Sequence, residues 1–257
     1  MEVKWYGTAT LAYSAEGKTI LFDPFLPMNL KLPQPELNEL AACGDIFITH
    51  GHFDHLIDVP KVVASGGGPV FCSKTAAETL IREGVKESNI IVVKPGDLIE
   101  RGPFRITVLR GKHIRFDLKL IMQTLFNRRV IIHRHNLKLM LRESRRYPAG
   151  EVLVYLIEAE GKRILHLGSL NMDETESYPI TVDVLTVPYQ GRSDLPSYTL
   201  KIIKRVQPQI AYLHHFDNSF PPVSSPVDVQ PFISSTKKQF TGLRVIIPEA
   251  FKSLPLP

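Results

Sequence analysis

Apolar residues in the first half of the chain come in short runs, and Gly, Pro and Asp separate these runs. Short apolar or alternating stretches bounded by turn residues are typical of β-strands. One longer stretch has helical spacing, with Ser73 as its N-cap and Gly84 as its stop, and predicts a helix over residues 74–84. The predicted strands are residues 3–6, 11–14, 19–22, 45–49, 69–72, 90–93 and 104–109.

The second half repeats this pattern with one interruption. Residues 114–147 carry apolar side chains at mixed helical spacings among basic ones, which predicts a partly helical, amphipathic insertion. We expect this insertion to belong to a single domain covering residues 1–257. The predicted strands of this half are residues 152–157, 163–167, 183–187, 208–213 and 243–247, and its helices are residues 198–205 and 227–240.

Composition places the chain among ordinary globular proteins, but its charge is unevenly distributed. The 257 residues are 44% hydrophobic and 22% charged, with a net charge of +5. Eleven Lys or Arg and two acids lie between Arg110 and Arg146, so this segment carries +9 and the remainder −4. Such a basic surface could attract a phosphate ester, a nucleic acid or an anionic membrane surface, or simply be the solvated face of a covering helix.

Cysteine usage and hydropathy predict a cytoplasmic protein. Cys43 and Cys72 provide no disulfide framework, and we expect both to be reduced residues in or near the core. No secretory signal is visible at the start of the sequence. No apolar run approaches the roughly 18 to 20 residues that a membrane-spanning helix requires.

The strongest chemical signal is the run His50-Gly51-His52-Phe53-Asp54-His55, directly after the predicted strand at residues 45–49. Imidazole nitrogens and carboxylate oxygens are ligands for divalent first-row metals, and a strand end holds them rigidly. The alternative is a solvated loop that happens to be rich in His. Since the chain has only nine His, the presence of three within six residues favours a metal site.

Four features together resemble the metallo-β-lactamase superfamily, in particular its small metal-dependent hydrolases. They are the opening Trp5 to Thr10 followed by Leu21 to Pro24, the His-x-His-x-Asp-His run, the hairpin from Gly161 to Gly168, and a late strand that ends in His. The resemblance implies a four-layer αββα sandwich. In this fold two mixed sheets pack face to face, helices lie outside, and metals bind at one edge.

The resemblance also assigns ligands residue by residue. His50 and His52 would bind a first metal, and Asp54 and His55 a second one. His113 is our preferred further ligand, with His133 and His135 inside the insertion as rivals. The last ligand would be His215 rather than His214, since neighbouring residues of a strand point to opposite sides. We interpret His166 as a packed structural imidazole.

Two departures from the family pattern concern the second metal. Gly168-Ser169 stands where relatives have Gly-Asp with a bridging carboxylate, and Thr8 stands where many have His. Asp173 lies nearby and is the alternative bridging carboxylate, although its register differs. The sequence therefore leaves open whether the site holds one ion or two. Zn is the first choice, and Mn and Fe are the alternatives.

The resemblance implies a hydrolase that uses a metal-activated water on an ester, lactone, amide or phosphodiester bond. Asp54 would orient or deprotonate that water. The basic insertion next to the expected site adds the hypothesis of a small, anionic substrate. Asp23 would fix a ligating His through its other ring nitrogen, or would simply end a strand. The competing hypothesis, motivated by Ser169, is a degenerate metal- or anion-binding module of the same fold without turnover.

Overall fold

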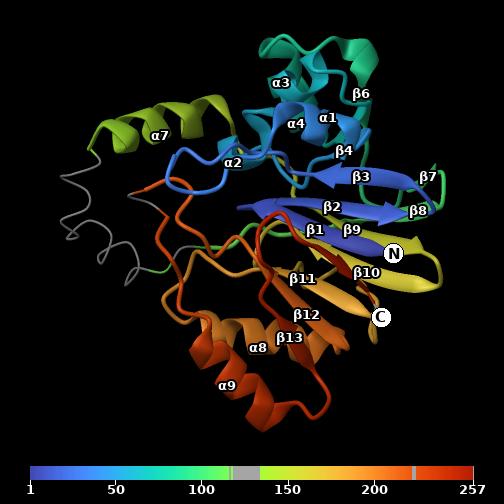
Figure 1. The fold of residues 1–257 in the computed structure, drawn as a ribbon, viewed down its shortest axis with the longest axis vertical. Helices are drawn as coiled ribbons and strands as arrows, with labels where there is room; N and C mark the ends of the chain where they lie inside the picture. Colours follow the sequence, from blue (N-terminus) through green and yellow to red (C-terminus); the bar gives the residue numbers. More distant parts are fainter. Residues whose placement is uncertain (116, 118–133, 222–223, 257) are drawn as a thin grey trace.

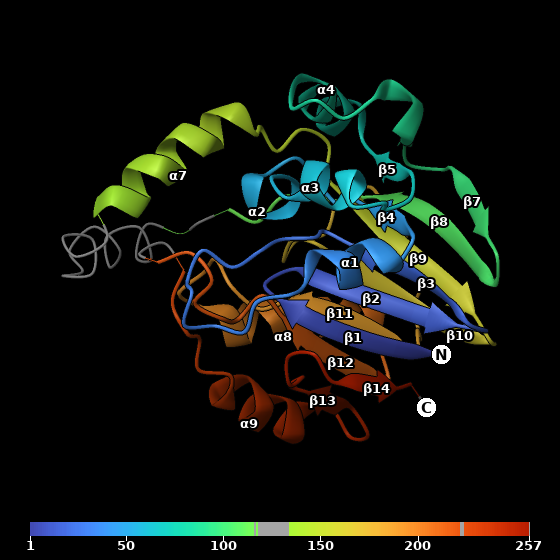
Figure 2. The ribbon, with the colours of Figure 1, turned by 45° about the horizontal axis from the view of Figure 1, so that its top comes forward.

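The computed structural model describes the chain except for residues 116, 118–133, 222–223 and 257. Its strands form two seven-stranded sheets. The sheets pack face to face, and helices cover their outer faces (Figures 1 and 2). This arrangement confirms the four-layer αββα sandwich expected from the sequence. Within the described residues, no helix is both long enough and apolar enough to cross a membrane.

The first sheet opens with an antiparallel meander and continues with parallel strands. The meander contains the strands predicted over residues 3–6, 11–14 and 19–22, and Glu16 and Gly17 take positive φ values of 46° and 74° at its second turn. From the third strand onward the pairs are parallel. In spatial order the strands are β14 (Ser253–Pro255), β1 (Glu2–Gly7), β2 (Thr10–Ala15), β3 (Lys18–Phe22), β4 (Asp45–Phe47), β5 (Val70–Cys72) and β6 (Ile90–Val92).

The second sheet has the same mixed character. A hairpin turning at Glu160 and Gly161 joins two antiparallel strands, and the strands that follow pair in parallel. In spatial order they are β13 (Arg244–Ile246), β12 (Ile210–His214), β11 (Val184–Pro188), β10 (Lys162–Leu167), β9 (Leu153–Ala159), β8 (Phe104–Arg110) and β7 (Leu98–Arg101).

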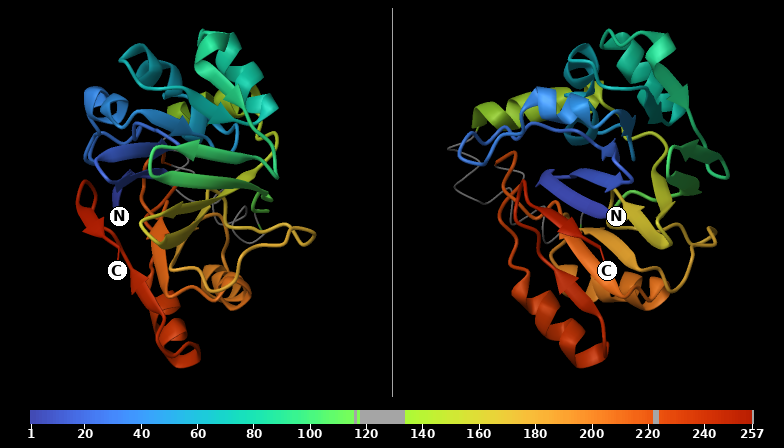
Figure 3. Two further views of the ribbon diagram at one scale, coloured as in Figure 1. Left: turned by 90° about the vertical axis from the view of Figure 1, so that its right-hand side faces the viewer. Right: turned by 45° about the vertical axis from the view of Figure 1, so that its right-hand side comes forward.

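Helices form the two outer layers. Those of the first half lie on the first sheet and those near the C-terminus on the second sheet, as the two views of Figure 3 also show. The Ser73 hydroxyl accepts a hydrogen bond from the Ala76 N–H, as its predicted N-cap role requires. The helices are α1 (Leu37–Ala42), α2 (Phe53–Leu56), α3 (Val59–Ala64), α4 (Lys74–Arg82), the 3-10 turn η1 (Glu87–Asn89), α7 (Arg134–Arg146), α8 (Leu195–Val206) and α9 (Gln230–Gln239).

Aromatic side chains fill the space between the sheets. Phe47 stacks on Phe71 with ring centroids 4.6 Å apart, and the Tyr155 hydroxyl donates a 2.8 Å hydrogen bond to the Ile48 carbonyl on the opposite sheet. Each fully buried side chain of this size contributes about 1.5–3 kcal/mol relative to exposure. Cys43 and Cys72 are buried free thiols, which agrees with the expected absence of a disulfide framework.

Several short elements were absent from the sequence prediction. They are α1, α2, α3, η1, β7 and β14, and none exceeds six residues. Elements of this length carry too few residues for a hydrophobic period to emerge. The predicted strand over residues 45–49 ends earlier, at Phe47, although the Ile48 N–H still bonds the Phe71 carbonyl.

Helix α7 occupies the C-terminal part of the predicted basic insertion. Its Glu143 is 1% exposed and pairs with Arg142 at 2.7 Å and with Arg146 at 3.3 Å. The helix lies against the outer layer of the first sheet, where it contacts α2. Among the rival ligands, His133 lies outside the described residues, and His135 lies on α7.

Candidate metal centre

The residues singled out from the sequence come together beyond the C-terminal ends of strands from both sheets. His50 and His52 follow β4, His113 follows β8, and His215 follows β12. Parallel strands deliver their C-terminal loops to one edge of a sheet. The face-to-face packing of the sheets then brings the loops of both sheets to one place.

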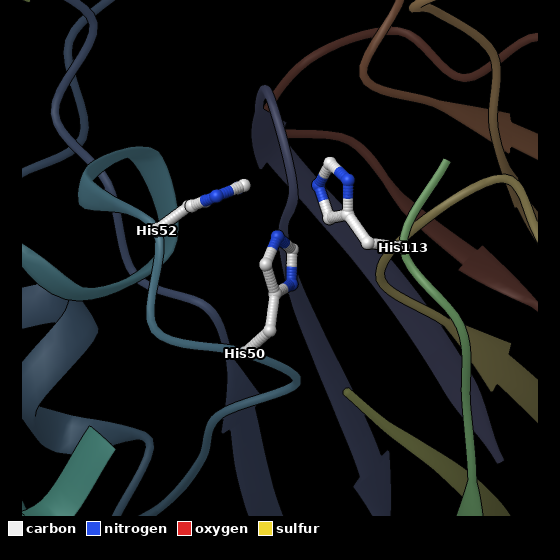
Figure 4. Close-up of side chains that lie close together, drawn as sticks. All are labelled: His50, His52 and His113. Atoms are coloured by element: carbon white, nitrogen blue, oxygen red, sulfur yellow. The ribbon is translucent and has the colours of Figure 1, made fainter. Parts of the chain in front are cut away.

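The imidazoles of His50, His52 and His113 form a first group. One ring nitrogen from each lies within 4.8 Å of the others, and the ring centroids are 4.5 to 5.1 Å apart. The three rings come from different directions and point toward a common centre (Figure 4). This is the convergence that a tetrahedral ion requires of its nitrogen ligands.

Burial keeps these imidazoles neutral. It lowers the pKa of His50 well below its ordinary value, and the neighbouring imidazoles lower it further. Burial likewise lowers the pKa of His52 to about 4, and it lowers the pKa of His113. Since only a neutral imidazole has a lone pair for a metal, all three are ready to bind an ion near neutral pH.

The backbone of the motif loop depends on the glycine within it. The Gly51 N–H donates a 2.8 Å hydrogen bond to the Ala149 carbonyl, and a Cβ on Gly51 would stand 2.2 Å from the Pro148 carbonyl oxygen. Any other residue would push this loop away from the segment that follows α7. The glycine therefore keeps His50 and His52 in position.

Asp54, His55 and His215 form a second group, again with one donor atom each within 4.8 Å. Asp54 Oδ2 lies 3.2 Å from His215 Nε2 and 3.7 Å from His55 Nε2. Burial would raise the pKa of Asp54, but His55 and the hydrogen bond to His215 lower it below its ordinary range. The Asp54 carboxylate is therefore ionised and can accept hydrogen bonds or bind a cation.

Asp23 contacts His55 at Nδ1, the ring nitrogen that faces away from the second group. Its carboxylate is fully buried and accepts hydrogen bonds from the Thr49 N–H at 2.8 Å and the Thr49 hydroxyl at 2.6 Å. Its Oδ2 also lies 2.9 Å from His55 Nδ1. Burial would lower the pKa of His55, but the carboxylates of Asp23 and Asp54 raise it. A proton on Nδ1 leaves Nε2 as the nitrogen that faces the second group.

The two groups are immediate neighbours. The rings of His50 and His55 have centroids 4.0 Å apart, one ring belonging to each group. Two ions held by these groups would therefore bind side by side. This geometry suits a dinuclear centre, and occupation of the first group alone gives a mononuclear one.

Ser169 and Asp173 have other roles in the structure. The Ser169 hydroxyl accepts a 2.9 Å hydrogen bond from the Ile114 N–H and so fixes the backbone next to His113. Asp173 accepts hydrogen bonds from Thr175 in its own turn. Neither residue belongs to the two donor groups found among the described residues.

The remaining imidazoles that we singled out point into the interior. His214 Nε2 donates to the Leu167 carbonyl at 3.1 Å, and the ring is fully buried. His166 is also fully buried, and its Nδ1 lies 2.8 Å from the Tyr13 hydroxyl of the opposite sheet. Burial lowers the pKa of both, to about 4 for His166. Their placement is that of packed structural residues.

Sequence reasoning missed two supports of the second group. The Gln190 side-chain oxygen accepts a 3.0 Å hydrogen bond from His215 Nδ1. Asp217 accepts the Thr8 N–H at 2.9 Å, and the Thr8 carbonyl in turn accepts the His215 N–H at 2.8 Å. Asp217 stands two residues after His215, which is a weak signal. Gln190 lies on a different loop, and no spacing in the sequence relates it to His215.

Comparison with known proteins agrees with this architecture. A sequence profile of the β-lactamase superfamily domain matches residues 2–215. A metal-dependent hydrolase of Polynucleobacter asymbioticus is 25% identical over 234 residues, which cover 85% of this chain and 75% of the relative.

Two solved structures illustrate the range of the fold. Igni18, a metallo hydrolase of Ignicoccus hospitalis, superposes with a TM-score of 0.64 at 16% identity, covering 98% of this chain and 97% of its own. CmlA, a diiron β-hydroxylase of Streptomyces venezuelae, gives a TM-score of 0.58 at 15% identity. The superposition covers 99% of this chain and 54% of the CmlA chain. The chain belongs to the β-lactamase superfamily, and it groups with the metal-dependent hydrolases of that superfamily.

Proposed function

We propose that this metal-dependent hydrolase cleaves an ester, lactone, amide or phosphodiester bond in a small, anionic substrate, using divalent ions held by the two donor groups. His50, His52 and His113 would hold the first ion. Asp54, His55 and His215 would hold the second. The observation that carries the proposal is the pair of adjacent three-residue groups, each with its donor atoms within 4.8 Å.

The chemistry of the donor set fits a borderline divalent ion. Five imidazoles and one carboxylate match the nitrogen and oxygen preferences of Zn, with Mn or Fe as alternatives. Such an ion supplies a Lewis acid that makes water nucleophilic near neutral pH. The fold does not choose among these metals, because it is shared by a metallo hydrolase and a diiron β-hydroxylase.

Asp54 is the residue placed to handle a proton. Its carboxylate is ionised, and its Oδ2 lies 3.2 Å from His215 Nε2, in the same donor group. The second carboxylate oxygen can accept a hydrogen bond from a water in the site and orient the lone pair of that water toward a carbonyl or phosphoryl centre. Gln190 fixes the His215 ring and thereby the position of Asp54.

The alternative is a metal- or anion-binding module without turnover. It is favoured by Ser169, whose hydroxyl bonds a backbone N–H and contributes no bridging carboxylate. Under this alternative Ser169→Asp would add a second ion and create activity that the natural protein lacks. Under the hydrolase proposal the natural protein is active, and Ser169→Asp changes an existing rate.

Metal analysis combined with a substrate panel tests the proposal. We expect one or two ions per chain and turnover of at least one chromogenic ester, lactone, amide or phosphodiester. His52→Ala should lose both metal and turnover, whereas Asp173→Ala, which removes a carboxylate outside both groups, should keep both. Absence of bound metal, or turnover that His52→Ala leaves unchanged, would contradict the proposal.

A further inference from the structure

The loop between β3 and α1 carries an exposed apolar tip. Leu30 is 85% exposed, the largest exposed fraction of any large hydrophobic side chain in the part of the chain that the structure describes. Lys31, which follows it, is exposed as well. No acidic residue occurs between Asp23 and Glu36. The tip therefore presents an apolar group next to a cation, and the sequence of this loop supplies no acid beside them.

Hydrogen bonds join this loop to α7. The Asn29 N–H donates to the Ser219 carbonyl at 2.9 Å. Two residues further along the chain, the Pro221 carbonyl accepts a 3.0 Å hydrogen bond from Asn136 on α7. Residues 218–221 thus join the loop to the helix, and we call the three segments together the rim: the loop at residues 24–36, residues 218–221 and α7.

The rim borders the metal centre. The Phe220 ring packs edge-on against the His215 ring, with centroids 6.1 Å apart. The ribbon views place α7 and the loop at residues 24–36 at one end of the molecule, while both chain termini lie at the other end (Figures 1 and 2). A partner that covered the rim would therefore face the site.

Helix α7 makes the rim basic. It contains five Lys or Arg and one acid, Glu143. Glu143 is 1% exposed and pairs with Arg142 and Arg146, and Arg146 also pairs with Glu83 at 2.6 Å. The five cations therefore outnumber the two acids that pair with them. Arg145 is exposed beside this cluster.

We propose that the rim docks on the surface of an anionic lipid bilayer, with Leu30 inserted at the headgroup boundary and Lys31 and the exposed Arg142 and Arg145 of α7 over the headgroups. A bilayer surface takes up an apolar side chain and attracts neighbouring cations. A nucleic acid would satisfy the cations but leave Leu30 in water. The charge and the exposed leucine together therefore favour the bilayer. Docking does not depend on the proposed hydrolysis, so the two proposals fail separately.

Vesicle co-sedimentation with the full chain tests the docking. We expect binding to vesicles of equal parts phosphatidylcholine and phosphatidylglycerol, weak binding to phosphatidylcholine alone, and release at high salt. Leu30→Ser should lower the affinity about tenfold, because it removes the inserted apolar group. Lys31→Glu combined with Arg145→Glu should lower it about 25-fold or more, because each cation near an anionic surface contributes about fivefold.

Matched variants on the opposite side provide the controls. Ile180 is 59% exposed and precedes β11, whereas the site follows that strand. Lys237 and Lys238 are exposed in the last turn of α9. Ile180→Ser, and Lys237→Glu combined with Lys238→Glu, should leave vesicle binding unchanged. Circular dichroism would verify that every variant remains folded.

Three results would overturn the docking proposal. The first is equal binding to neutral and anionic vesicles, and the second is rim variants that bind like the controls. The third is salt-sensitive binding of a single-stranded RNA oligonucleotide without vesicle binding, which would assign the rim to nucleic acid. In each case metal content and turnover, measured separately, would leave the proposed hydrolase function standing.

Discussion

Replacing Asp23 by Asn tests how the second donor group is oriented. The Asp23 carboxylate accepts three hydrogen bonds: the Thr49 N–H, the Thr49 hydroxyl and His55 Nδ1. Asn has nearly the same shape but only one acceptor oxygen. If that oxygen keeps the Thr49 N–H, the amide NH₂ faces the Thr49 hydroxyl and His55.

The substitution should reverse the tautomer of His55. An amide N–H facing Nδ1 requires a lone pair there, and the proton of a neutral ring then moves to Nε2. Because Nε2 faces Asp54 and the second donor group, His55 would lose the lone pair that a metal needs. Loss of a residue that orients a ligating His weakens metal binding by about 10- to 100-fold.

Asp23→Asn should also reduce the stability of the metal-free protein. All three charge-assisted hydrogen bonds become neutral ones. Since each charge-assisted bond contributes about 1 kcal/mol more than a neutral one, we expect a loss of about 3 kcal/mol in the free energy of unfolding.

Competition with a chromogenic chelator measures metal affinity, and urea unfolding after metal removal measures stability. Asp45→Asn is the matched control, because Asp45 pairs with Arg101 at the start of β4, away from both donor groups. This half-exposed pair should contribute at most about 1 kcal/mol and leave metal binding unchanged. If Asp23→Asn binds two ions with wild-type affinity, the orienting role of Asp23 is wrong.

Three further predictions concern the same region. Gly168→Ala would place a methyl group 2.0 Å from the Thr49 hydroxyl oxygen. Urea unfolding should therefore show a loss of about 3 kcal/mol in the free energy of unfolding. The control Gly161→Ala, in a hairpin turn with open space around it, should lose about 1 kcal/mol. Ser169→Ala leaves a buried backbone N–H without its acceptor and should cost about 1–3 kcal/mol; a neutral result would refute this role. The folded-state pKa of His52 is about 4 against 6.5 when unfolded. The unfolded chain therefore takes up the proton first, and the metal-free protein should lose stability from pH 6.5 down to about 4. His52→Gln should flatten this dependence of Tm on pH.

The sequence predicts the fold well wherever an element is long or a motif is local. The residues of β2 and β3 are buried on both faces of their sheet, so these strands are visible in the chain as short apolar runs. One face packs between the sheets (Leu11, Tyr13, Ile20 and Phe22) and the other under the helices (Ala12 and Leu21). The run from His50 to His55 stands out because four polar side chains follow an apolar strand directly. His113 and His215 were reached through family resemblance, and the structure places them in the two groups to which that resemblance points.

Other features depend on contacts between distant segments. Gln190 bonds His215 across 25 residues, and Ser169 bonds Ile114 across 55. No local spacing encodes such pairs, because packing of the second sheet brings these loops together. Helix α2 escaped prediction because it has only four residues, three of which lie within the metal motif itself. Four residues are too few to show a helical period.

The charge balance of the centre supports the substrate class proposed above. Within the two donor groups of the described residues, Asp54 is the one acidic ligand, and the five imidazoles add no negative charge. Asp23 adds a second carboxylate that does not face the ions directly but contacts His55 Nδ1. Two divalent ions would therefore bring four positive charges against two negative ones. Ser169, in the position of the bridging acid, leaves this excess uncompensated. A site with such a surplus favours an anionic group among the atoms it binds, because the attraction is strong where water is excluded. When both donor groups hold an ion, Ser169 in place of the bridging acid thus strengthens the case for a negatively charged substrate.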